Sequence, residues 1–225
     1  MRPLLAIIGL ILACIALAAY TSRLRPHTSE EASRLPETGS PEKAGFGITD
    51  PKTLLPYDKV TAGALHATLE IEGRGTMILE LYPKAAPQTV KHFQDLCARG
   101  FYNGILFHRV EAGFVAQAGD PDSKSMDPSN LRGLTSVQVG ERFNLGSNGS
   151  GETVPLEAKL PHKTDSIGLA RATNTDSGDS QFFINLSDND AALDGKYCAF
   201  GRIIKGAEIA SKIAIGDRIT RLSIQ

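Results

Sequence analysis

The feature that most constrains the fold of this chain is a succession of short strand-like segments separated by turns. Residues 67–72 alternate between apolar and polar side chains with the period of two that is typical of a half-buried strand. The Gly-Arg-Gly sequence at 73–75 predicts a hairpin turn, and residues 77–82 form the expected return strand. Further strands are expected at 105–109, 114–117, 166–170, 181–185, 199–203 and 219–224.

Only two segments in this region have the spacing of a helix. Val90, Phe93 and Leu96 recur at helical intervals, and Gly100 follows them as it would at a helix C-terminus. Residues 207–215 predict a second helix. About eight strands connected by hairpins and loops, together with two helices, predict a mainly β fold. The specific expectation is a closed eight-stranded antiparallel β-barrel capped by two α-helices.

The sequence ahead of these strands has two parts. Residues 1–20 contain Arg2 and then an uncharged apolar run, expected to be a hydrophobic helix, which is typical of a secretory signal peptide. The run is close to the shortest length that spans a membrane, so a retained membrane anchor is the alternative. Residues 21–64 mix Ser, Thr, Glu, Pro and Gly without periodicity and predict a largely disordered linker. Residues 65–225 are then the folded domain, located outside the cytoplasm.

Composition and spacing argue against several classes of function. A net charge of −1 gives no support for binding to nucleic acid. The histidines and cysteines lack the spacing of a metal site, and no nucleophile lies in a triad or elbow pattern. No metal or other cofactor is therefore expected. Cys97 and Cys198 are expected to be small buried residues, and a disulfide between them is the open alternative.

Aromatic and hydrogen-bonding residues on successive expected strands are the main candidates for a site. One strand carries Arg109, the next Phe114 and Gln117, and a later one Phe183. Taken singly, Arg109 is most simply a solvated residue and each phenylalanine a core residue. Taken together, strands that each bring an aromatic and a polar side chain can form a partly exposed apolar pocket with a few convergent polar groups.

Three motifs resemble those of the cyclophilins, the peptidyl-prolyl cis-trans isomerases. They are FHRVEAGFVAQAGD at 107–120, LARA at 169–172 with SQFFIN at 180–185, and LDGKYCAFGRI at 193–203. The resemblance covers about 65–225 and is closest to the bacterial exported, periplasmic subgroup. It implies a monomeric isomerase without a cofactor that rotates X–Pro bonds in unfolded or exported proteins and assists their folding. Its only membrane contact would be the N-terminal segment.

The resemblance also assigns the catalytic groups. Arg109 corresponds to the catalytic arginine, and Gln117 and Gln181 to polar groups that engage the peptide backbone. Rotation of an amide breaks no bond, so neither a nucleophile nor a metal is needed. A fixed cation that donates to the prolyl nitrogen would stabilise the twisted amide over the planar one. Gln117 would hold the carbonyl that rotates.

The remaining assignments concern the pocket walls. Phe114, Val115, Phe183 and Leu193 correspond to the walls around the proline ring. Ala170 and Arg171 correspond to the stretch beside the residue that precedes proline, Tyr197 to the pocket edge, and His108 to a structural histidine.

Some features depart from the family pattern. Ala192 replaces a common tryptophan, so weak binding of cyclosporin-type macrocycles is expected, and Tyr197 replaces a histidine. The segment 120–165 is long and rich in Gly, Ser, Asp and Pro, and its role is open. Two alternatives therefore stand beside the isomerase. One is a non-catalytic proline-peptide-binding module or holdase chaperone that uses the same pocket. The other is a structural or envelope-interaction protein that acts through 120–165.

Overall fold

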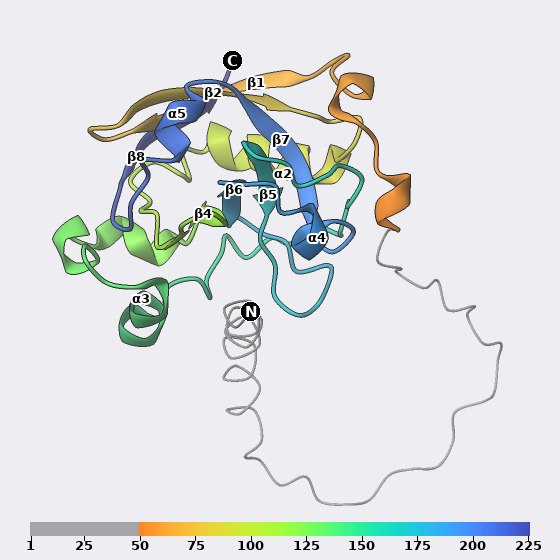
Figure 1. The fold of residues 1–225 in the computed structure, drawn as a ribbon. Coiled ribbons are helices and arrows are strands. Elements are labelled where there is room, and N and C mark those ends of the chain that lie inside the picture. Colours follow the sequence, from red (N-terminus) through yellow and green to blue (C-terminus); the bar gives the residue numbers. More distant parts are fainter. Residues whose placement is uncertain (1–49) are drawn as a thin grey trace, which may run out of the picture. The chain divides into compact units, whose positions relative to one another are not determined.

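The computed structural model describes residues 50–225, which form one curled sheet of eight antiparallel strands. The strands lie in the order β3-β4-β6-β5-β7-β2-β1-β8 (Figure 1). The mainly β class and the eight strands are confirmed, with bounds shifted by a few residues; most of the segment 105–109 precedes its strand. The strands are β1 (Leu65–Ile71), β2 (Gly75–Leu81), β3 (Arg109–Glu111), β4 (Val115–Ala118), β5 (Ser166–Leu169), β6 (Phe182–Asn185), β7 (Cys198–Lys205) and β8 (Ile219–Ile224).

The prediction of a closed barrel is wrong, because the sheet stays open between β3 and β8. Closure would need these two edge strands to pair along their length, and β3 has only three residues. The approach segments do meet: Leu106 and Arg218 form an isolated bridge, and the Phe107 amide donates to the Asp217 carbonyl at 2.8 Å. The backbone bonds of this contact reach only the first residue of β8, Ile219, and none of β3, so the curl narrows the gap between the edges without pairing β3 with β8.

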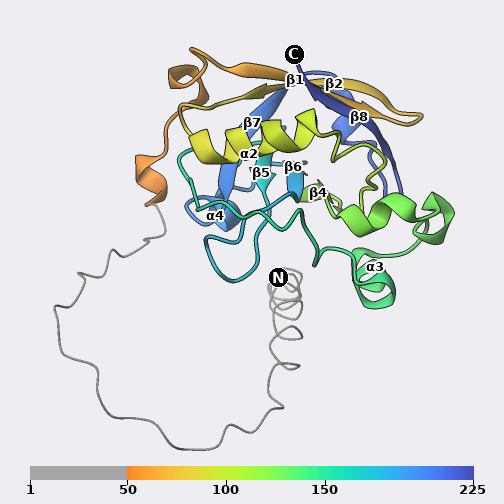
Figure 2. The ribbon, with the colours of Figure 1, turned by 180° about the vertical axis from the view of Figure 1, so that it is seen from behind.

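The longest helix of the described part is α2 (Pro87–Ala98), which lies across the sheet (Figure 2). Its buried face includes Val90, Phe93 and Leu96, which confirms the helical spacing. The second capping helix expected at 207–215 is wrong in extent, since α5 (Ala207–Ala210) is a single turn. Beyond it the amide of Ile213 bonds to the carbonyl three residues back, so the chain continues in tighter turns.

Two further α-helices were not predicted: α3 (Ser136–Phe143), which projects away from the sheet in Figure 1, and α4 (Asp190–Leu193). Both lie in segments for which neither a helix nor a strand was predicted. Short 3-10 helices lie at Pro51–Thr53, Tyr57–Lys59, Pro121–Ser125 and Pro128–Asn130.

An aromatic cluster fills the space between α2 and the sheet. The rings of Phe93 and Phe182 meet edge to face, with centroids 5.7 Å apart. Tyr102 joins them, and its hydroxyl donates to the Ser180 carbonyl at 3.0 Å, so the one polar group in the cluster is satisfied. Cys97 and Cys198 are both buried and free, which leaves them as packing residues without a disulfide between them.

Residues 50–64, at the end of the predicted linker, contact the folded domain. Val60 is buried, and the Tyr57 hydroxyl donates to the Pro161 carbonyl at 2.6 Å. The predicted signal peptide or anchor lies outside the described residues, so its fate stays a prediction. Between residues 50 and 225, no helix combines the length and the apolar character needed to cross a membrane.

Candidate active site

Four residues that face one another across adjacent strands form the floor of the candidate site. Arg109 on β3 pairs with Gln117 on β4, Gln117 pairs with Phe183 on β6, and Phe183 pairs with Gly168 on β5. Residues directly opposite in antiparallel strands project to the same face of the sheet. The register therefore brings three of the predicted site residues into one row, although 74 positions separate the first from the last in the sequence (183 − 109).

Arg109 lies at the edge of this row with its side chain 33% exposed. Its Nη1 donates to Gln117 Oε1 at 3.2 Å, and its Cζ lies 5.8 Å from the ring centroid of Phe114. Its Nε is 3.8 Å from a Glu111 carboxylate oxygen. These contacts hold a solvent-accessible cation against an aromatic ring.

The predicted wall residues form a small apolar cluster beside Arg109. Val115, Phe183 and Leu193 are buried at its centre, and three partly exposed side chains pack against them: Phe114, Ala170 and Tyr197. The structure thus brings all of these residues together, while their contact with a substrate stays a prediction. The cluster is separate from the main core, and its half-buried members give it an accessible side.

The ring of Phe183 is held in place by what lies next to it. A Cβ atom added at Gly168 would come within 2.3 Å of Phe183 Cζ, so the ring occupies space that only a glycine leaves free. His162 stacks on the ring at 5.6 Å between centroids and 22° between planes. Tyr197 meets it edge to face at 6.1 Å. Phe183 is therefore positioned by close packing on several sides.

Two residues that support the site, His162 and Gly168, were not predicted from the sequence. His162 is fully buried; its Nδ1 accepts from Asn185 Nδ2 at 3.3 Å, and its Nε2 donates to the Tyr197 carbonyl at 3.2 Å. Burial lowers the pKa of His162 to about 4, so the ring is neutral near pH 7. No local pattern marks His162, whereas a glycine inside a strand pattern is a known sign of close approach and could have indicated Gly168.

The neighbouring His108 is buried, and its ring lies close to Gly146. Burial, and then the positive charge of Arg109, lower the pKa of His108 to about 4. Within residues 50–225 neither ring nitrogen has a hydrogen-bond partner. A neutral, enclosed ring agrees with the structural role predicted for this histidine.

The two remaining predicted residues lie on different sides of the cluster. Gln181 accepts a hydrogen bond from Gln117 Nε2 at 2.8 Å and so extends the polar row. Arg171 stacks its guanidinium on Tyr197, 4.7 Å from the ring centroid, and its Nε donates to the Lys196 carbonyl at 2.8 Å. Arg171 is therefore part of the rim, apart from Arg109.

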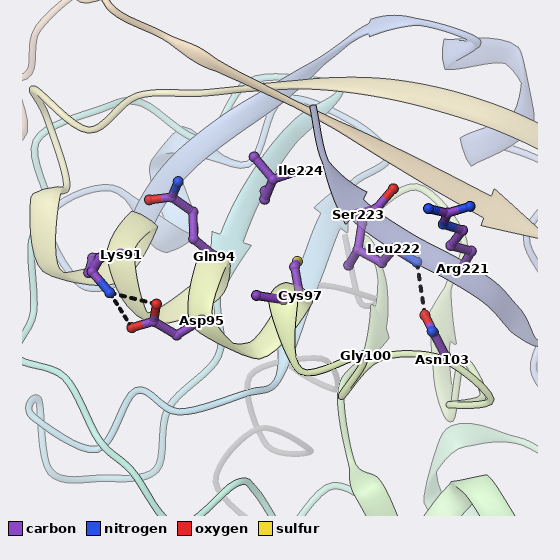
Figure 3. Close-up of a pocket in the computed structure, with 11 residues that line it drawn as sticks. Lys91, Gln94, Asp95, Cys97, Gly100, Asn103, Arg221, Leu222, Ser223 and Ile224 are labelled. Atoms are coloured by element: carbon purple, nitrogen blue, oxygen red, sulfur yellow. Dashed lines mark hydrogen bonds and ion pairs between the residues drawn. The ribbon is translucent and has the colours of Figure 1, made fainter.

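The other hollows and clusters of the described residues lie apart from this site. No three His, Cys, Asp or Glu side chains within 50–225 are placed to hold a metal ion. A cavity of about 570 Å³ lies between α2 and β8, where Lys91 pairs with Asp95 and Asn103 accepts from the Leu222 amide (Figure 3). It contains none of the predicted site residues, so the polar row and the apolar cluster remain the candidate site.

Comparisons with known proteins point to one family. Residues 66–223 match the sequence profile of the family described as cyclophilin type peptidyl-prolyl cis-trans isomerase/CLD. The peptidyl-prolyl cis-trans isomerase of Helicobacter pylori is 38% identical over 178 residues, which cover 76% of this chain and 94% of that protein. Isomerase B of Bacillus subtilis is 32% identical over 157 residues, or 69% of this chain and 94% of that protein.

Solved structures add evidence on the fold. A cyclophilin type isomerase of Cryptosporidium parvum superimposes with a TM-score of 0.58 at 23% identity, covering 72% of this chain and 98% of that chain. The same protein, crystallised in the presence of the dipeptide Ala-Pro, gives a TM-score of 0.56 at 24% identity and covers 71% of this chain and 98% of that chain.

Proposed function

This chain belongs to the cyclophilin type peptidyl-prolyl cis-trans isomerase family, and we propose that Arg109 is the group that accelerates its reaction. The enzyme interconverts the cis and trans forms of X–Pro bonds, and proline-containing peptides are its ligands. Membership of the family does not establish which side chains of this chain catalyse the reaction, or which proteins are its substrates.

The reaction is slow without a catalyst because resonance gives the amide C–N bond partial double-bond character, with a barrier of about 18–20 kcal/mol. In the twisted state the prolyl nitrogen loses conjugation and regains a lone pair. A hydrogen-bond donor fixed beside that nitrogen stabilises the twisted state more than the planar one, as catalysis requires. Each tenfold gain in rate needs about 1.4 kcal/mol, so a few such contacts give a large acceleration.

The observation that carries this proposal is the position of Arg109 at the rim of the apolar cluster. Nη1 is engaged by Gln117, which leaves other N–H groups of the guanidinium for a substrate. The cluster around Phe183 and Leu193 suits a proline ring and excludes water that would otherwise favour the planar amide. The Gln117 amide donates one N–H to Gln181, and its second N–H is available to the carbonyl that rotates.

We also propose that the clients are exported proteins and that the enzyme acts as a monomeric folding helper in the periplasm. The support is the apolar run within 1–20 and the resemblance to the exported subgroup, both read from the sequence. Cell fractionation followed by mass spectrometry of the N-terminus tests this: a periplasmic protein that starts near Ala19 means release, a membrane-bound protein that starts near Met1 means an anchor, and a cytoplasmic protein contradicts the proposal.

The role of Arg109 is tested by Arg109→Ala, with Arg109→Lys as the variant that keeps the charge but loses the planar fork of donors. NMR exchange spectroscopy on a proline peptide measures catalysed isomerisation and binding in the same sample. Arg109→Ala should lower the isomerisation rate on the order of 10²–10³-fold, the usual loss of one transition-state donor, with an unchanged unfolding midpoint. Near-parental exchange would overturn the mechanism. A parent that binds the peptide without accelerating exchange would instead favour the holdase alternative.

A further inference from the structure

A chain of hydrogen bonds connects Arg109 with the segment 120–165. Arg109 Nη1 donates to Gln117 Oε1 at 3.2 Å, and Gln117 Nε2 donates to Gln181 Oε1 at 2.8 Å. Gln181 Nε2 in turn donates to the backbone carbonyl of Asn148 at 2.8 Å. Asn148 is thus the far end of a row whose near end is the proposed catalytic cation.

The two ends of this row fix the orientation of the two glutamine amides between them. A guanidinium can only donate, and a backbone carbonyl can only accept. The two glutamine amides between them must therefore both turn their nitrogen toward Asn148 and their oxygen toward Arg109. If Gln117 were reversed, its NH₂ group would face the guanidinium, and two donors would oppose each other beside the reacting bond. The carbonyl of Asn148 therefore determines which group Arg109 meets.

The position of that carbonyl depends on a buried carboxylate. Asp120 is fully buried, and its Oδ2 accepts from the amides of Gly146 at 2.7 Å and Asn148 at 3.2 Å. Its Oδ1 accepts from the Asp122 amide at 3.0 Å. Asp122 adds a second tie, since its carboxylate accepts from Asn148 Nδ2 at 2.8 Å. One carboxylate thus holds the turn that presents the Asn148 carbonyl to Gln181.

We infer that Asp120 is a positioning residue for the isomerase reaction, acting through the Asn148 carbonyl on the orientation of Gln181, Gln117 and finally Arg109. This gives part of the long segment 120–165 a function: it supplies the fixed acceptor at the end of the polar row. The inference rests on the role proposed for Arg109, and it adds a group that touches neither substrate nor reacting atoms.

A double-mutant cycle tests the connection. Asp120→Asn keeps the shape of the side chain but offers an oxygen to only one of its two sets of amides. Gln181→Met removes the middle of the row. The matched control is Asp127→Asn, because Asp127 accepts from the Ser129 amide at 2.8 Å in the same segment but has no bond to the row. Each variant is assayed for kcat and KM, and the side-chain amide resonances of Gln117 and Gln181 are followed by NMR in the free protein.

Asp120→Asn should lower kcat by about tenfold, which corresponds to one lost positioning contact, while KM stays within about twofold. The Gln117 amide resonances should shift or broaden. In the Gln181→Met background the same substitution should change kcat less than about twofold, because coupled residues are not additive. Asp127→Asn should leave both kcat and the Gln117 resonances unchanged. If Asp120→Asn does not fold, Asp120→Glu, which keeps the carboxylate but moves it away from the amides of Gly146 and Asn148, replaces it in the cycle.

Equal losses of kcat in both backgrounds would overturn the inference, as would unchanged amide resonances in Asp120→Asn. The two proposals fail in different ways. A fully active Arg109→Ala variant contradicts the proposed catalytic role, whereas additive effects in a protein whose Arg109→Ala variant is inactive contradict only the role of Asp120.

Discussion

Two neighbouring phenylalanines on β6 have opposite surroundings. Phe182 is fully buried and meets Phe93, Tyr102 and Phe107 edge to face in the main core. Phe183 is also buried, at 4% exposure, but it belongs to the small cluster beside Arg109. Successive strand residues point to opposite faces, so one strand supplies both the core and the site.

The comparison shows that burial alone does not distinguish a structural aromatic from a functional one. The difference lies in the neighbours: the Phe182 ring meets three fully buried rings, whereas Phe183 lies between a buried histidine and half-buried rim residues. A residue whose contacts continue to the surface can meet a ligand, and a residue enclosed on all sides cannot.

Truncating each phenylalanine in turn tests this contrast most strongly. Phe182→Ala should lower the free energy of unfolding by about 3–5 kcal/mol, the usual cost of a large cavity in a core. Phe183→Ala should cost less, because half-buried neighbours can move into the space, yet it should abolish measurable binding of a proline peptide. Urea unfolding and peptide titration followed by NMR measure the two effects. Equal stability losses with equal residual affinity would show that the two faces of β6 do not differ in function.

Acid should affect stability through the two buried histidines. The pKa of His108 and of His162 is lowered to about 4 from an ordinary value of 6.5, mainly by burial. The unfolded chain therefore binds more protons, and stability falls as the pH drops from 6.5 toward 4, by at most about 3 kcal/mol for each ring. His162→Gln should remove its share of this slope in urea unfolding at pH 7 and 4.5.

A slope that is the same in the parent and in His162→Gln would mean that the ring beneath Phe183 does not titrate on unfolding. In that case His162, which stacks on the Phe183 ring, would be less enclosed than its packing indicates.

Local sequence patterns predicted most of the strands and the α2 helix, because period-two alternation and helical spacing are encoded within a few residues. They did not predict that the sheet is open, because closure depends on whether β3 and β8 pair, and these strands are distant in the sequence. The extent of α5 was also missed, since the change to tighter turns after Ala210 leaves no clear mark in the apolar spacing.

The candidate site likewise contains residues that the sequence could predict and residues that it could not. Arg109, Gln117 and Phe183 could be predicted because each lies in a motif on an expected strand, and the register then aligned them. His162 and Asn148 could not, because both come from the long segment 120–165 and reach the site only through tertiary packing. Contacts made by irregular segments have no periodicity from which to infer them.

The glycine beneath Phe183 offers a smaller test of the same contrast. Gly168→Ala should displace the ring, since the added Cβ would lie 2.3 Å from Phe183 Cζ, and destabilise the fold by about 1–3 kcal/mol, as overpacking does. Peptide affinity should fall more than the stability loss alone explains. Gly140→Ala in α3 is the control, because its nearest neighbour would be 3.8 Å away and alanine favours a helix. An unchanged peptide affinity in Gly168→Ala would show that binding does not depend on the exact position of the Phe183 ring.

The smallest expected effect concerns turnover between pH 7 and 9. A guanidinium keeps its charge throughout this range, and both buried histidines are already neutral above pH 7 because their pKa is lowered to about 4. Arg109 and the two histidines therefore do not change protonation, and kcat/KM for a proline peptide should vary by less than about twofold, well under the tenfold that 1.4 kcal/mol represents. The measurement is made at constant ionic strength, so that screening of Arg109 stays the same. A steep step in kcat/KM in this range would reveal a second, titrating group that acts beside Arg109. Catalysis at the face of β6 that carries Phe183 would then depend on a charged group outside both the apolar cluster and the polar row.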